Sequence, residues 1–160
     1  MQVVIRRATP GDVRELCQLL NEGDSYHAAA LPTVFSRAKA PTWREPYLRE
    51  RIADDDSVVL VADAGHELVG VVIAILRRTS PEVPVLVQRR YAWVDTLVVR
   101  EVYRRRGVGR ALMEQVHRWA LDHGVNEVEL NVWEFNEAAI ALYAALGYTT
   151  TSRRMRLVLR

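Results

Sequence analysis

The sequence has one cysteine, one lysine and no apolar run of the length that crosses a membrane. A single cysteine excludes an internal disulfide and a cysteine-based zinc site. Cys17 lies between Leu16 and Leu19 in a helical pattern, which favours a buried thiol without a chemical role. The chain passes from Met1 directly into the strand-like residues 3–5, with no apolar leader. These absences predict a cytoplasmic protein in a reducing compartment, with no membrane association.

The composition is that of a folded domain. Of 160 residues, 49% are hydrophobic and 26% are charged, which is typical of a globular chain that builds its own core. We therefore expect a single domain over residues 1–160. The net charge is only +2, although arginines gather in residues 100–110 and 153–160, so attraction to anions is local. Binding to nucleic acid is not indicated.

Hydrophobic periodicity predicts an α/β fold with a mixed sheet. Residues 57–62 and 68–76 are β-rich runs on either side of a turn, the pattern of an antiparallel hairpin. Residues 91–99 are apolar on both alternating faces, as in a strand that is covered from both sides. Prolines break residues 23–56, which predicts short helices and loops there. The expected order is strand, helices, three strands, helix, strand, helix and a last strand that contains Met155, Leu157 and Leu159.

The stretch from Arg104 to Leu112 reads RRRGVGRAL and precedes a helical pattern. Its two glycines let the main chain approach a ligand, and the following helix presents unpaired N–H groups to an anion. The arginines add side chains that pair with phosphate oxygens. A Walker A loop is excluded because the only lysine is Lys39, and a dinucleotide-binding fingerprint would need glycine in place of Leu112. The motif therefore predicts a phosphate cradle, with a solvated basic loop as the alternative.

Three motifs resemble the GNAT superfamily of N-acetyltransferases. They are residues 95–99 as its fourth strand, Arg104-x-x-Gly107-x-Gly109 as its cofactor motif, and Asn136, Ala139, Tyr143, Gly147 and Tyr148 as its closing motif. The resemblance implies a GNAT-like fold with a central, mostly antiparallel twisted sheet of six to seven strands. It also implies about four helices on both faces and a split near the fourth and fifth strands. Arg105 departs from the commonest family form, which has glycine there.

The resemblance further implies that acetyl-CoA is the co-substrate and that no metal is needed. Main-chain groups of Leu97, Val98 and Val99 would bind the pantetheine arm and the acetyl carbonyl. Amides would surround the pyrophosphate from Arg104, Arg105, Arg106, Gly107, Val108, Gly109 and Arg110. Asn136 would touch the pantetheine, while its place before a helical pattern also suits a plain N-cap.

Acetyl transfer to an amine requires two proton movements, and two residues are the candidates for them. Asp95 lies in an apolar central strand, where burial would make its carboxylate a stronger base. Its alternative role is to orient the amine or the backbone, and Glu134 and His27 are possible substitutes. The resemblance places Tyr143 where the family has the tyrosine that donates a proton to the leaving thiolate. From helical spacing alone, Tyr143 would be a core residue.

The acceptor is expected to bind the irregular residues 24–56 and 77–90, with Asp24 and His27 as the candidate contacts. The predicted partner is a small-molecule or peptide amine, which the sequence does not identify, and a homodimer is possible. The main alternative is a non-catalytic acyl-CoA-binding regulatory module that keeps the cradle. A nucleic-acid-binding domain is the third hypothesis, and the chain has no motif that supports it.

Overall fold

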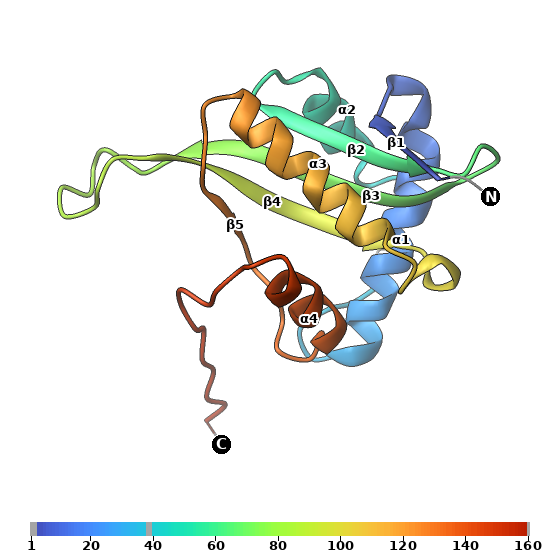
Figure 1. The fold of residues 1–160 in the computed structure, drawn as a ribbon. Coiled ribbons are helices and arrows are strands. Elements are labelled where there is room, and N and C mark those ends of the chain that lie inside the picture. The colour runs from blue at the N-terminus through green and yellow to red at the C-terminus, as the bar shows by residue number, and fades with distance from the viewer. Residues whose placement is uncertain (1–2, 38–39, 160) are drawn as a thin grey trace.

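One mixed sheet forms the centre of the computed structural model, which describes residues 3–37 and 40–159. Lys39 lies outside the described residues. The sheet has the strand order β1-β2-β3-β4-β5 (Figure 1). Its strands are β1 (Val4–Arg7), β2 (Ser57–Asp63), β3 (Leu68–Arg78), β4 (Arg90–Val99) and β5 (Val128–Leu130). The runs of valine, isoleucine and leucine in β2 and β3 are buried on both faces, which makes these strands the core of the sheet.

The pairing confirms the hairpin predicted between residues 57–62 and 68–76. β2 and β3 pair in antiparallel register from Ser57↔Ile75 to Asp63↔Leu68. β1 and β2, and β3 and β4, are also antiparallel, whereas β5 runs parallel to β4. The connection between β3 and β4 extends beyond the body of the molecule (Figure 1).

The expected number of six to seven strands is wrong for the part of the chain that the structure describes, and the sheet is mixed rather than mostly antiparallel. The predicted last strand is an extended segment outside the sheet, in which Met155, Leu157 and Leu159 are 87%, 81% and 85% exposed. β5, the neighbouring edge strand, has only 3 residues and so offers few backbone partners. The alternation of apolar residues at Met155, Leu157 and Leu159 was therefore not enough to predict a strand of the sheet.

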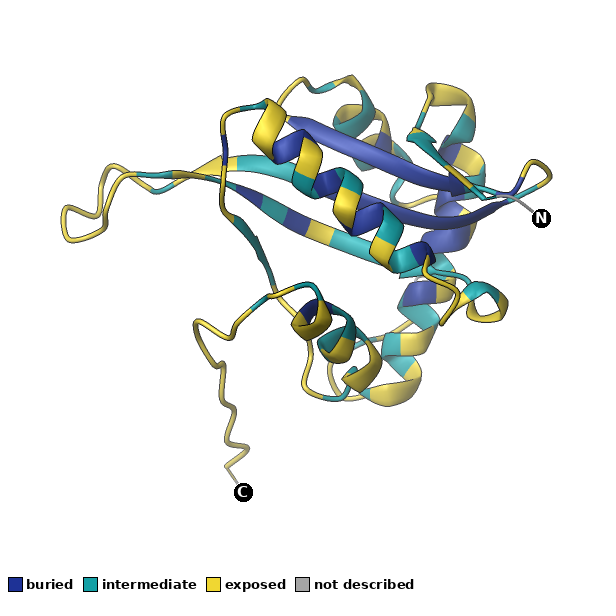
Figure 2. Cartoon of the chain, in the orientation of Figure 1, coloured by how far each residue is buried: buried dark blue, intermediate teal, exposed yellow. Residues whose placement is uncertain are grey.

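Helices cover both faces of the sheet. α1 (Val13–Ala30) and α2 (Glu45–Ala53) lie on one face, and α3 (Val108–Asp122) lies across the other (Figure 1). α4 (Glu137–Ala145) follows β5 and packs near the start of α3. Buried residues form one cluster under α3 and a second under α1 and α2 (Figure 2). None of the described helices has the length and apolarity needed to span a membrane.

The helix α1 is longer than the sequence predicts, because it continues through Gly23 to Ala30. Gly23 faces β4 so closely that an added Cβ would lie 2.8 Å from Cγ2 of Val98. The absent side chain therefore allows α1 to cross the end of β4 in close contact. Its last turns carry His27 to the loop before α4, where the His27 and Phe135 ring centroids are 5.5 Å apart. Residues 23–30, predicted to form short helices and loops, thus belong to one continuous helix.

Candidate active site

The predicted phosphate cradle is a tight loop that joins β4 to α3. A 3-10 turn (Glu101–Tyr103) follows β4, and the loop ends at Gly107, which adopts a left-handed conformation with φ of 83°. The Ala111 N–H bonds to the Gly107 carbonyl and closes the first turn of α3. Within the described chain, the backbone N–H groups from Arg105 to Arg110 have no hydrogen-bond acceptor. This run of free donors at a helix N-terminus suits an anion.

Gly107 and Gly109 are glycines for different structural reasons. Gly107 needs its left-handed backbone, which a side chain disfavours. At Gly109 an added Cβ would lie 3.2 Å from Cδ2 of Leu142 in α4, a tight contact that the Leu142 side chain would have to shift to relieve. Gly109 therefore allows α4 to approach the first turn of α3, a contact that the sequence alone does not show.

The arginines of the loop differ in whether an acid neutralises them. Arg100, just before the loop, forms ion pairs with Glu22 and Glu67. Arg104, Arg105 and Arg106 make no ion pair with any acidic residue in residues 3–37 and 40–159. The Arg104 Nε donates to the Val99 carbonyl at 3.0 Å, and its guanidinium lies 5.3 Å from the Tyr26 ring centroid. These three charges remain available to phosphate oxygens.

Arg105 occupies a backbone conformation that favours glycine, with φ of 59°. We expect Arg105→Gly to raise the stability by about 1 kcal/mol, because relief of left-handed strain outweighs the greater entropy of glycine in the unfolded chain. In thermal unfolding this corresponds to a rise of about 2–4 °C. Arg106→Gly is the control, since Arg106 has no positive φ and should be destabilised by the same substitution. Equal shifts for both variants would contradict the strain at Arg105.

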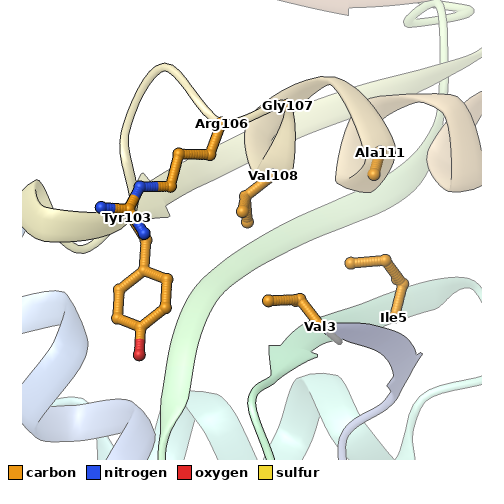
Figure 3. Close-up of a pocket in the computed structure, with 7 residues that line it drawn as sticks. All are labelled: Val3, Ile5, Tyr103, Arg106, Gly107, Val108 and Ala111. Atoms are coloured by element: carbon orange, nitrogen blue, oxygen red, sulfur yellow. The ribbon is translucent and has the colours of Figure 1, made fainter. Parts of the chain in front are cut away.

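A hollow of about 440 Å³ lies beside the cradle, on the side that faces β1 (Figure 3). Arg106, Gly107, Val108 and Ala111 form one wall, and Val3, Ile5 and Tyr103 complete it. Neither Asp95 nor Tyr143 lines this hollow. It therefore adjoins the anion-binding loop rather than the place where acetyl transfer is expected.

The sheet opens between β4 and β5. β5 pairs only with the stretch from Ala92 to Val94, so the following part of β4 lacks a neighbour on that edge within the described chain. Leu97 and Val99 pack against the core cluster on the α3 side, and Val98 packs against the cluster under α1. The main-chain groups of Leu97, Val98 and Val99 thus border the opening.

Asp95 lies where β5 leaves β4, but it is exposed rather than buried. The β3 register passes from Ile73↔Thr96 to Ala74↔Val94, so Asp95 is the extra residue of a β-bulge. The expected burial is wrong, since Asp95 is exposed at the bulge rather than packed in the core. The Tyr47 hydroxyl, from α2, donates to Asp95 Oδ2 at 2.7 Å. Burial and this hydrogen bond raise the pKa of Tyr47. Sequence reasoning missed Tyr47, since nothing local links it to Asp95.

Tyr143 lies in α4 and is buried in the core cluster under α3. Burial raises its pKa to about 12. Its hydroxyl makes no hydrogen bond to a side chain or carbonyl of the described residues, and its ring centroid lies 5.6 Å from that of Tyr148. The Tyr148 hydroxyl instead lies 2.8 Å from His117 Nε2. Asn136 caps α4, because its side chain accepts a hydrogen bond from the Ala139 N–H.

The two candidate acceptor contacts, Asp24 and His27, already interact with other residues of the chain. Asp24 forms an ion pair with Arg44 at 2.9 Å. His27 Nδ1 lies 2.9 Å from the Gly23 carbonyl, and its ring packs among Tyr26, Phe35 and Phe135. Glu134 is exposed and lies 3.7 Å from Arg153. Across the described residues, no group of three or more His, Cys, Asp or Glu side chains is placed to hold a metal ion.

The fold, with a sheet that opens between β4 and β5, is of the GNAT type. The chain belongs to the acetyltransferase (GNAT) family, whose model matches residues 25–148. N-acetyltransferase 8F1 from Rattus norvegicus is 29% identical over 94 residues, which are 59% of this chain and 40% of that protein. L-ornithine N5-acetyltransferase NATA1 from Arabidopsis thaliana is 31% identical over 96 residues, or 60% and 41% of the two chains. The chain thus spans about two fifths of the length of these relatives.

Solved structures show the same fold over nearly the whole chain. The F44R mutant of the BH1408 protein from Bacillus halodurans has a TM-score of 0.90 at 28% identity and covers 98% of this chain and 99% of its own. AAC(6')-Iy in complex with the bisubstrate analog CoA-S-monomethyl-acetylneamine has a TM-score of 0.78 at 18% identity, with 100% and 99% covered. The second likeness shows the fold alone.

Proposed function

We propose that the protein is an acetyl-CoA-dependent N-acetyltransferase that transfers the acetyl group to a primary amine. The observation that carries the proposal is the run of N–H groups from Arg105 to Arg110 that are unpaired among the described residues, beside three arginines that have no acidic partner there. A pyrophosphate supplies the two negative groups that such donors suit. The family and its relatives, which include an ornithine and a streptothricin acetyltransferase, support the reaction class.

The main chain of β4 supplies the donors at the opening of the sheet. In this proposal, Leu97, Val98 and Val99 bind the pantetheine arm and the thioester carbonyl through backbone groups. Donors that are fixed in a strand stabilise the oxyanion of a tetrahedral intermediate without reorganisation. Asn136 caps the start of α4, and in this proposal its side chain also touches the pantetheine arm.

The amine must lose a proton before it attacks. A primary amine with a pKa of about 10.4 is neutral in only about one molecule in 2,500 at pH 7, a penalty of about 4.6 kcal/mol. Asp95 is the exposed carboxylate at the opening, and Tyr47 fixes its orientation. We assign Asp95 to accept the ammonium proton, directly or through water. The amine nitrogen then bonds to the acetyl carbon, and the carbon–sulfur bond breaks.

The departing sulfur takes up negative charge, and Tyr143 stabilises this charge by donating a hydrogen bond to the sulfur. A thiol has an ordinary pKa of about 8.5, so complete transfer from a phenol whose pKa is about 12 is uphill by about 5 kcal/mol. The raised pKa keeps the phenol protonated throughout the neutral range. Tyr143 therefore acts in this proposal as a permanent donor to the thiolate, which takes its final proton from solvent.

A binding and turnover assay tests the proposed function. Acetyl-CoA should raise the midpoint of thermal unfolding, because a ligand that binds only the folded state stabilises it. A panel of small primary amines and peptides with free amino termini should then release free CoA, measured as a new thiol. Binding without thiol release for any acceptor would favour the non-catalytic regulatory module. Absence of a thermal shift would overturn the cofactor site itself.

A further inference from the structure

Next to Asp95, the sheet carries a surface that the helices leave uncovered. Ala92 and Val94 of β4 belong to the core under α3, so Trp93 between them faces the side of α1 and α2. Trp93 is opposite Ile75 of β3, and Arg77 lies two residues further along on the same face. On this face Ile75 and Trp93 are partly exposed and Arg77 is exposed, and this end of β3 is teal and yellow in Figure 2. The helix α2 reaches this part of β4 through the Tyr47–Asp95 hydrogen bond.

Arg77 is held in place on this surface without an acidic partner. Its guanidinium carbon lies 4.5 Å from the Trp93 ring centroid. The nearby Arg89 stacks in the same way on Tyr91 at 4.6 Å, but it also forms ion pairs with Glu127 and Glu129. For Arg77, no carboxylate within ion-pair distance occurs in the described part of the chain. A stacked guanidinium with unused donors suits an incoming carboxylate.

Asp95 and Arg77 lie on opposite sides of Trp93. Residues two apart on one face of a strand are about 7 Å apart, and Asp95 is two positions from Trp93. The Tyr47 contact shows that the Asp95 carboxylate points to the same face as the indole. The surface therefore carries the Asp95 carboxylate beside Trp93 and the Arg77 guanidinium stacked on the Trp93 ring. It begins at the opening where the thioester is proposed to lie.

We propose that the acceptor is a zwitterion, a primary amine that carries a carboxylate several bonds away. The amine binds at Asp95, the carbon chain lies against Trp93, and the carboxylate pairs with Arg77. This assignment rests on the proposed function and names its acceptor class. Arg77 is a specificity-determining residue because it contacts the part of the acceptor that does not react.

Three five-carbon probes test the effect of the charge at the end of the acceptor that does not react. They are 5-aminopentanoate, pentylamine and 1,5-diaminopentane, which share the amine and chain length and differ at the far end. The wild-type kcat/KM, measured by thiol release, should favour 5-aminopentanoate by about 10-fold over pentylamine, and 1,5-diaminopentane should be the poorest substrate. Equal values for 5-aminopentanoate and pentylamine, or a preference for the diamine, would overturn the proposal.

The variant Arg77→Gln tests the residue itself. It should reduce the preference for 5-aminopentanoate over pentylamine from about 10-fold to near unity, through a higher KM for the carboxylate. Arg78→Gln is the matched control, since Arg78 is the next residue of β3 and faces the opposite side of the sheet. It should leave the preference unchanged. A preference that survives in Arg77→Gln, or is lost equally in Arg78→Gln, would overturn the role of Arg77.

Binding measured without turnover distinguishes failure of this proposal from failure of the proposed function. Trp93 fluorescence in the presence of CoA should report tighter binding of 5-aminopentanoate than of pentylamine, and a Trp93→Phe variant identifies the signal. If this preference is seen and no amine releases a thiol, the N-acetyltransferase function fails and the zwitterion site stands. If both amines bind equally while pentylamine is acetylated, the function stands and the zwitterion site fails.

Discussion

Replacement of Arg104 and Arg106 by glutamine is expected to weaken acetyl-CoA binding by about 10–100-fold. Each charge-assisted hydrogen bond to a phosphate contributes about 1.5–3 kcal/mol, and solvent screening reduces this contribution at exposed side chains. Both side chains are exposed and neither is paired with an acid within the described chain. The backbone donors from Arg105 to Arg110 persist in the variant, so binding should weaken without being abolished. Isothermal titration calorimetry with acetyl-CoA measures the change.

The control is the double variant Arg118→Gln and Arg154→Gln. It removes the same net charge from exposed positions, one on α3 and one in the extended C-terminal segment. Its affinity for acetyl-CoA should remain within about 2-fold of the wild type at moderate salt, because screening limits the effect of distant charges. Equal weakening in the two double variants would show a diffuse charge effect and contradict a specific phosphate cradle.

The conformation of the loop that we propose as the phosphate cradle was predictable because its determinants are local in the sequence. Gly107 supplies the left-handed residue before a helix, and the amphipathic pattern from Val108 fixes where the free N–H groups begin. The hairpin of β2 and β3 was predictable for the same reason, since its strands and turn are contiguous. A pattern within one contiguous stretch of sequence determines each of these features.

The features that were not predictable depend on contacts between distant segments. The bulge at Asp95 exists only in the register of β4 against β3, and the Tyr47 contact joins residues 48 apart in sequence. The predicted short helices and loops begin at Gly23, whereas in the fold α1 continues and Gly23 makes room for Val98. The apolar alternation at residues 155–159 resembles a strand, but pairing also needs an edge of sufficient length. Sequence patterns describe each segment and leave its partner undetermined.

The second large effect is expected for Tyr143→Phe, which should lower kcat by about 100-fold and leave the affinity for acetyl-CoA nearly unchanged. Phenylalanine keeps the buried ring in the core cluster and removes only the donor to the sulfur. A 100-fold loss corresponds to about 2.7 kcal/mol of transition-state stabilisation, which is the range of a hydrogen bond to a developing anion. Steady-state kinetics with thiol detection, together with calorimetry, separates the two parameters.

The pH dependence and a neighbouring tyrosine test whether the hydroxyl of Tyr143 is the cause. Because burial raises the pKa of Tyr143 to about 12, the phenol stays protonated at lower pH, and the ratio of wild-type to Tyr143→Phe rates should be constant from about pH 7 to about pH 10. Tyr148→Phe removes a hydroxyl from an adjacent ring whose contact is His117 rather than the opening. It should keep kcat within about 3-fold of the wild type. A comparable loss in Tyr148→Phe, or a ratio that falls towards unity below about pH 10, would assign the thiolate contact to another group, since a permanently protonated donor contributes equally across that range.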